Sequence, residues 1–174
     1  MKQLYTACNV IKSTYISISV RKHIKEFIMQ EFGLPGEDYI RVHLNSFLGK
    51  TILMNAEKLP YRQIKPKEDP ISATELRILL PTAIKHYTVT AASKELISEW
   101  FEKYFQQQFI FFVKGQIAIT GNELGAIRMF MKLYRVDTES YDLELARKCW
   151  RDYKDRIYKV NNIRPKRNTA HFAT

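Results

Sequence analysis

Two amphipathic segments between Asn122 and Lys159 constrain the fold most, because each has an apolar side that needs a partner. Apolar residues recur every three or four positions on both sides of a polar break at Asp137–Ser140, as in helices with one buried face. The stripes are Leu124, Ile127, Met131 and Tyr134, then Leu143, Ala146, Trp150, Tyr153 and Ile157. We therefore expect a helical hairpin in which the two stripes face each other.

Both hairpin helices carry capping signals at their N-terminal ends. Gly121 and Asn122 are a plausible start for the first helix, and Ser140 or Asp142 can cap the second. Asp142 and Glu144 would then lie in the first turn of the second helix, where the helix dipole favours anions. The cations further along suit the other end of the dipole, so helix chemistry explains part of the charge pattern.

Periodicity and turn signals predict further elements before the hairpin. Residues 1–15 are either an edge strand or an irregular arm, and Gln116–Thr120 is expected to be extended. Expected helices cover residues 17–32 or 19–32 with a stop at Gly33–Gly36, 46–58 capped by Ser46, and 93–113 capped by Thr90 or Ser93. Expected strands cover residues 39–44, 74–80 and 84–90.

These elements predict an α+β fold that is mostly helical. It has about five helices and a small two- or three-stranded antiparallel sheet, and it ends in the helical hairpin. At 174 residues the chain is expected to be a single domain that can divide into two lobes. The expected parts are an N-terminal lobe at 1–58, a Pro/Lys-rich connector at 59–70, an aromatic-rich helical lobe at 71–160 and a basic tail at 161–174.

The positive charge is concentrated near the carboxyl end. Of the formal net charge of +10, residues 1–70 carry 11 basic against 7 acidic side chains, residues 71–144 carry 8 against 9, and residues 145–174 carry 9 against 2. Such clustering favours an anionic partner such as nucleic acid, because counterion release drives binding to phosphates. A solvated helix with a loose basic tail is the alternative.

The longest apolar segment, Ser93–Val113, is dense in aromatic residues. At helical spacing these rings predict a buried core, with any excess apolar surface available for a subunit interface. A stacking platform for bases is the functional alternative, because rings accept any base of a single strand.

The motifs of common enzyme and metal sites are absent from the sequence. There is no Ser/His/Asp order with recognisable flanks, no zinc-binding helical His pair and no dinucleotide fingerprint. Gly49-Lys50-Thr51 lacks the first glycine of a phosphate loop, and Cys8 and Cys149 make no metal spacing with the histidines. We therefore expect no catalysis, no cofactor and no metal. No apolar run approaches about 18 residues, so we expect a soluble intracellular protein without membrane contact.

Part of the C-terminal region resembles a known group of proteins. The stretches Ala126–Val136, Asp137–Asp142 and Ala146–Lys154 resemble the C-terminal half of small basic proteins encoded by tailed bacteriophages and mobile elements of gut bacteria. The resemblance covers about a quarter of the chain. It implies a phage or mobile-element context, in the host cytoplasm or the virion, and supplies no catalytic residues. The hairpin is also similar to a helix-turn-helix pair, although its turn lacks the glycine often found there.

Two functional hypotheses follow, and we favour the first. In the first, the protein is a non-catalytic nucleic-acid binder, with DNA preferred over RNA, whose second hairpin helix and tail contact phosphates. In the second, it is a structural component of a virion, such as a head–tail connector or ring-type subunit, and contacts copies of itself or other virion proteins. Regulation through protein contacts is a third possibility. The expected nucleic-acid-binding residues are Arg147, Lys148, Arg151, Lys154, Lys159, Arg164, Lys166 and Arg167.

Overall fold

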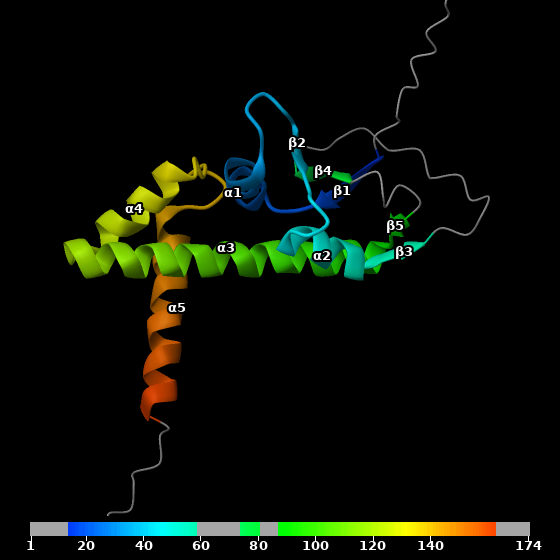
Figure 1. Cartoon of the computed structure of the whole chain (residues 1–174). Coiled ribbons are helices and arrows are strands. Elements are labelled where there is room, and N and C mark those ends of the chain that lie inside the picture. The colour runs from blue at the N-terminus through cyan, green and yellow to red at the C-terminus, as the bar shows by residue number, and fades with distance from the viewer. Residues whose placement is uncertain (1–13, 59–73, 81–86, 163–174) are drawn as a thin grey trace, which may run out of the picture. The chain divides into compact units, whose positions relative to one another are not determined.

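The structure, a computed structural model, describes residues 14–58, 74–80 and 87–162 (Figure 1). The chain forms two compact units, residues 1–105 and 106–174, so the boundary lies inside helix α3 (Ala91–Thr120). The expected connector at 59–70 and the tail from residue 163 lie outside the described residues. The division differs from the expected lobes, because strands from both sides of residues 59–70 pair in one sheet.

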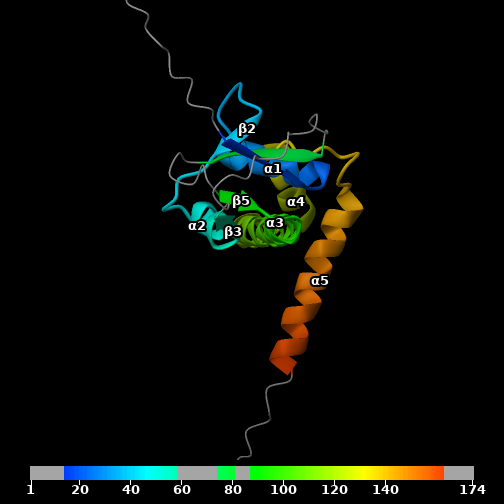
Figure 2. The same ribbon diagram turned by 90° about the vertical axis from the view of Figure 1, so that its right-hand side faces the viewer.

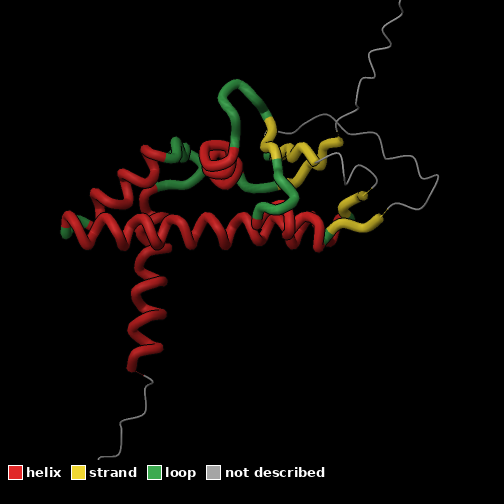
Figure 3. Tube along the Cα trace, in the orientation of Figure 1, coloured by secondary structure: helices red, strands yellow, loops and turns green. Residues whose placement is uncertain are grey.

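The first unit contains a three-stranded sheet of order β1-β4-β2. Strand β1 (Thr14–Ser19) is antiparallel to the central β4 (Glu75–Leu80), whereas β2 (Tyr39–Arg41) is parallel to it. The sheet is therefore mixed, and the expectation of an antiparallel sheet was wrong for β2. The long connection from β2 to β4, which includes α2 (Phe47–Met54), permits the parallel direction, which a tight turn does not. Strands β3 (Ala56–Lys58) and β5 (Tyr87–Val89) form a separate antiparallel pair, and Figure 3 shows both groups of strands.

Alternate residues of the three-stranded sheet supply one side of the core of the first unit. Ile16, Ile78 and Ile40 align across the three strands and are buried. Helix α1 (Lys22–Phe32) adds Phe27, whose ring meets Phe105 of α3 edge to face at 5.2 Å. The period of two in the strands and of about 3.6 in the helices thus directs both sets of side chains inward.

Two of the expected helices begin or end differently in the structure. Residues 17–19 were expected to begin the first helix but belong to β1. Isoleucine and serine alternate from Ile16 to Ser19, as in a strand, and these residues pair with β4. Residues 56–58, expected to end the second helix, form β3 after the helix stops at Asn55. The cap of α2 is as expected, since the Gly49 N–H donates to Ser46 Oγ at 3.0 Å.

Helix α3 is longer than the sequence predicts. It continues through residues 116–120, which we expected to be extended, and ends where Gly121 adopts a φ of 67°. The Gly121 N–H donates to the Ile117 carbonyl at 2.8 Å, a helical end that glycine permits at positive φ. At its start, Ser93 N–H donates to Thr90 Oγ1 at 3.2 Å, which confirms Thr90 as the cap.

The second unit contains the expected helical hairpin of α4 (Glu123–Leu133) and α5 (Leu143–Asn162). Asn122 and Asp142 cap them, accepting from the N–H groups of Gly125 at 2.9 Å and Leu145 at 2.7 Å. Ala146 and Trp150 of α5 are buried, as are Ile127 and Phe130 of α4. Helix α5 begins beside α4 and extends beyond it (Figures 1 and 2), and residues 154–160 are exposed.

Candidate nucleic-acid interface of the helical hairpin

The turn between α4 and α5 is held by a compact set of backbone hydrogen bonds. The Val136 N–H donates to the Met131 carbonyl at 3.0 Å, and the Tyr141 N–H donates to the Asp137 carbonyl at 3.0 Å. Arg135 bridges the helix end and this turn with a φ of 50°, a left-handed conformation that an L side chain rarely adopts. These bonds therefore fix the backbone of Arg135 directly after α4.

Arg135→Gly tests the strain in this turn. A left-handed residue with a Cβ is disfavoured by roughly 1–2 kcal/mol, and glycine loses about 0.5–1 kcal/mol more in backbone entropy on folding. We therefore expect Arg135→Gly to raise the free energy of unfolding by about 0.5–1 kcal/mol in chemical denaturation. Arg135→Ala removes the same charge but keeps the Cβ, and should give no such gain. Equal stability of the two variants would contradict the argument.

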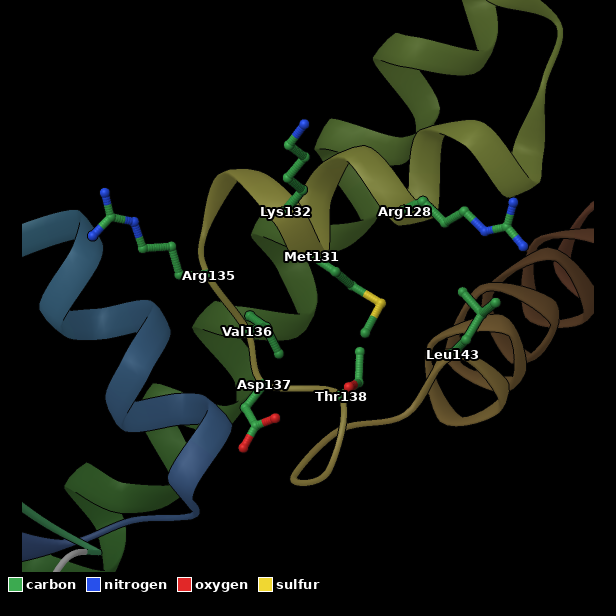
Figure 4. A pocket seen from close by; sticks show the side chains of 8 residues that line it. All are labelled: Arg128, Met131, Lys132, Arg135, Val136, Asp137, Thr138 and Leu143. Carbon is green, nitrogen blue, oxygen red and sulfur yellow. The ribbon is translucent and has the colours of Figure 1, made fainter.

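A pocket of about 530 Å³ opens where α4, the turn and the start of α5 meet (Figure 4). Its apolar lining includes Met131 and Val136, both buried, and Leu143. Figure 4 shows Met131 pointing toward Thr138, while the cationic side chains spread outward. The complete lining is Arg128, Met131, Lys132, Arg135, Val136, Asp137, Thr138 and Leu143.

The rim of this pocket has an excess of positive charge. Arg128, Lys132 and Arg135 line it, and within the part of the chain that the structure describes they make no ion pair. Asp137 is the only acid in the lining, and its Oδ1 accepts the Glu139 N–H at 3.0 Å. Unpaired cations around a hollow attract anions, since binding there does not first require an existing ion pair to break.

The sequence prediction did not include these three cations. They stand four and three residues apart, the spacing that places side chains on one side of a helix, so the signal was present in the sequence. The larger charge excess near the carboxyl end drew the prediction to α5 instead. The spacing alone does not show that a pocket lies beside them.

Two of the cations predicted on α5 are already ion-paired. Arg147 Nη1 lies 2.6 Å from Glu144 Oε1, and Lys154 Nζ lies 2.7 Å from Glu123 Oε1 at the start of α4. The hydrogen bond from Lys154 lowers the pKa of the Glu123 carboxyl. The indole N–H of Trp150 lies beside this carboxylate and contributes to the same shift, although its geometry falls short of a hydrogen bond. Both predicted residues thus contribute less net charge to a ligand than the sequence indicates.

The remaining predicted cations on α5, which are Lys148, Arg151 and Lys159, are exposed. Arg151 lies on the same side as Arg147 and Lys154, and it makes no ion pair among the described residues. At about 100° per residue, Lys148 and Lys159 lie about 60° and 80° round the helix from Arg151, on the side away from Lys154. Arg164, Lys166 and Arg167 lie outside the described residues. The structure therefore places Arg147, Arg151 and Lys154 on one side of α5, with Lys148 and Lys159 on the neighbouring side next to Arg151.

Other chemically active side chains form no site in the described residues. Burial raises the pKa of the Cys149 thiol above its ordinary value, so the thiol stays protonated near neutral pH. His23 is buried with its ring 5.4 Å from that of Phe105. Within residues 14–58, 74–80 and 87–162, no three His, Cys, Asp or Glu side chains gather as metal ligands would.

No helix in the described ranges combines the length and apolar character needed to span a membrane. No protein-family model, curated protein or solved structure matches the chain.

Proposed function

We propose that the protein is a non-catalytic nucleic-acid-binding protein of a phage or mobile element, and that its helical hairpin contacts phosphates. DNA is the first ligand to test. The observation that carries the proposal is the pocket rim of Arg128, Lys132 and Arg135, three cations without an ion pair among the described residues. The localisation that goes with it is the host cytoplasm or the virion.

The chemistry of the rim suits a phosphate backbone better than a small metabolite. Arginine offers paired N–H donors to phosphate oxygens, and lysine adds a mobile point charge. Arg151 on α5 supplies a further exposed cation that makes no ion pair in the described part of the chain. Several separated cations favour a polymer with repeated charges, because each neutralised phosphate releases counterions.

Salt-dependent binding of the paired variant Arg128→Gln/Lys132→Gln tests the proposal. We expect wild type to bind a labelled oligonucleotide with an affinity that falls as salt rises. The variant should bind roughly 10- to 100-fold more weakly at low salt, because it loses two charged hydrogen bonds. The slope of log K against log salt should fall by about one for each lost phosphate contact.

The matched control is Lys58→Gln/Lys114→Gln, which removes the same charge from exposed residues that do not line the pocket. It should change affinity much less than the pocket variant does. Equal losses in both variants would mean that net charge, and not the pocket rim, accounts for binding. Wild-type binding that persists unchanged in high salt would overturn the electrostatic proposal.

A structural role in a virion or other assembly is the second candidate, supported by exposed apolar residues on α3. Phe111 is 65% exposed and Ile119 is 80% exposed. Gly115 lies between them at helical spacing, with open space where a Cβ would stand. An apolar strip of this kind is typical of subunit contacts. Light scattering separates the candidates, since a ring-type subunit should form a closed oligomer and a simple binder a monomer or dimer.

A further inference from the structure

Four aromatic rings form a connected row in the first unit, which we call the aromatic row: Phe47, Trp100, Tyr104 and Phe32. Ring centroids are 5.3 Å apart for Phe47 and Trp100, 5.2 Å for Trp100 and Tyr104, and 5.8 Å for Tyr104 and Phe32. Trp100 and Tyr104 are stacked with 15° between their planes. Helices α2, α3 and α1 each contribute to the row, so packing fixes its geometry.

The aromatic row lies at the edge of the core. Phe101 and Phe105, one residue further along α3, are buried, whereas Trp100 and Tyr104 are only partly covered. Phe47 is 68% exposed although its ring contacts Trp100. Core packing therefore accounts for the neighbouring stripe on α3 but leaves the open side of Phe47 unexplained.

Two exposed lysines stand close in sequence to members of the aromatic row, on the same helices. Lys50 follows Phe47 by three residues on α2, and Lys103 lies between Trp100 and Tyr104 in sequence, within about 60° of Trp100 round the helix. Both are exposed and make no ion pair among the described residues. Glu99 lies farther round α3 from Tyr104 than Lys103 does.

We propose that the aromatic row stacks the unpaired bases of a single-stranded nucleic acid while Lys50 and Lys103 contact its phosphates. The inference rests on the proposed nucleic-acid function and narrows its ligand to single strands. Rings next to cations are the arrangement by which proteins hold single strands without reading sequence. A duplex hides the faces of its bases from such rings. A protein partner fits less well, because lysine is depleted from protein interfaces.

The test compares full-length wild type with Phe47→Ala on a labelled oligothymidylate and on a duplex of equal length. We expect wild type to prefer the single strand. Phe47→Ala should weaken single-strand binding about 5- to 100-fold, the loss expected for one stacked base, and should leave duplex binding nearly unchanged. Phe47→Tyr should restore binding, and Met54→Ala, at a residue of α2 that is 86% exposed, should have no effect. Phe47 is itself largely exposed, so circular dichroism should show that Phe47→Ala folds like wild type.

Intrinsic fluorescence gives a second readout from the two tryptophans, Trp100 and Trp150. A base stacked on the row should quench the fluorescence of Trp100, so Trp100→Phe should abolish the quenching and retain most of the affinity.

The inference is overturned if Phe47→Ala binds the single strand like wild type while Arg128→Gln/Lys132→Gln loses binding, and the proposed function then stands. If wild type binds neither oligonucleotide, the inference and the proposed function are both overturned. If Phe47→Ala alters self-association but not oligonucleotide binding, the aromatic row is a protein contact, and the inference is again overturned.

Discussion

Phe105→Ala should lower the free energy of unfolding by about 3–5 kcal/mol, the largest stability change expected here. The ring is 2% exposed and meets Phe27 at 5.2 Å and His23 at 5.4 Å between centroids. Removing it costs the transfer free energy of the ring and leaves a cavity between α1 and α3 that backbone relaxation fills only in part. Since whole domains are stable by about 5–15 kcal/mol, this loss is a large share of the total stability.

Urea denaturation followed by circular dichroism measures this loss. Phe111→Ala is the matched control, because it removes the same ring from the same helix at a position that is 65% exposed. Its unfolding free energy should stay within about 0.5 kcal/mol of wild type. A loss below about 1 kcal/mol for Phe105→Ala would show that this part of α3 is not the core of the first unit.

Gly49→Ala is the second large expected effect, a loss of about 3 kcal/mol or more. A Cβ at Gly49 would lie 2.0 Å from the carbonyl oxygen of His43, closer than atoms can approach. That same oxygen accepts the Ser46 N–H at 2.9 Å and the Ser46 hydroxyl at 2.6 Å. Relief of the clash therefore requires the capping turn before α2 to move, which breaks hydrogen bonds as well as packing.

Gly115→Ala provides a control of opposite sign. Gly115 is also inside a helix, but nothing lies within 4 Å of the place its Cβ would take. Alanine there should stabilise the protein by up to about 1 kcal/mol, because it favours helix more than glycine does. Thermal unfolding of the two variants should thus shift in opposite directions, and a stabilising Gly49→Ala would contradict the close approach at His43.

The structure gives the glycine of Gly49-Lys50-Thr51 a packing role in α2. The three residues lie inside α2, and Thr51 Oγ1 donates to the Phe47 carbonyl at 3.0 Å. The glycine is required by close packing on the preceding turn. The close packing that requires a glycine is visible only in three dimensions.

The sequence by itself determined the features that depend on neighbours a few residues away. Ser46, Thr90, Asn122 and Asp142 act as caps because a cap bonds an N–H only three residues further on. The amphipathic stripes likewise predicted five helices, a mostly helical α+β fold and the hairpin, since helical periodicity is a local property.

Tertiary structure decided what depends on residues distant in sequence. The direction of β2 and the pairing of residues 17–19 depend on β4, which lies far away in the sequence. Tertiary structure also decided which cations remain free of an ion pair within the described residues. The sequence showed where cations are dense, but Lys154 meets an acid 31 positions earlier in the chain, whereas Arg128, Lys132 and Arg135 surround a pocket. Counting charges locates an electrostatic bias, and only the fold decides which of those charges neighbouring acids already neutralise.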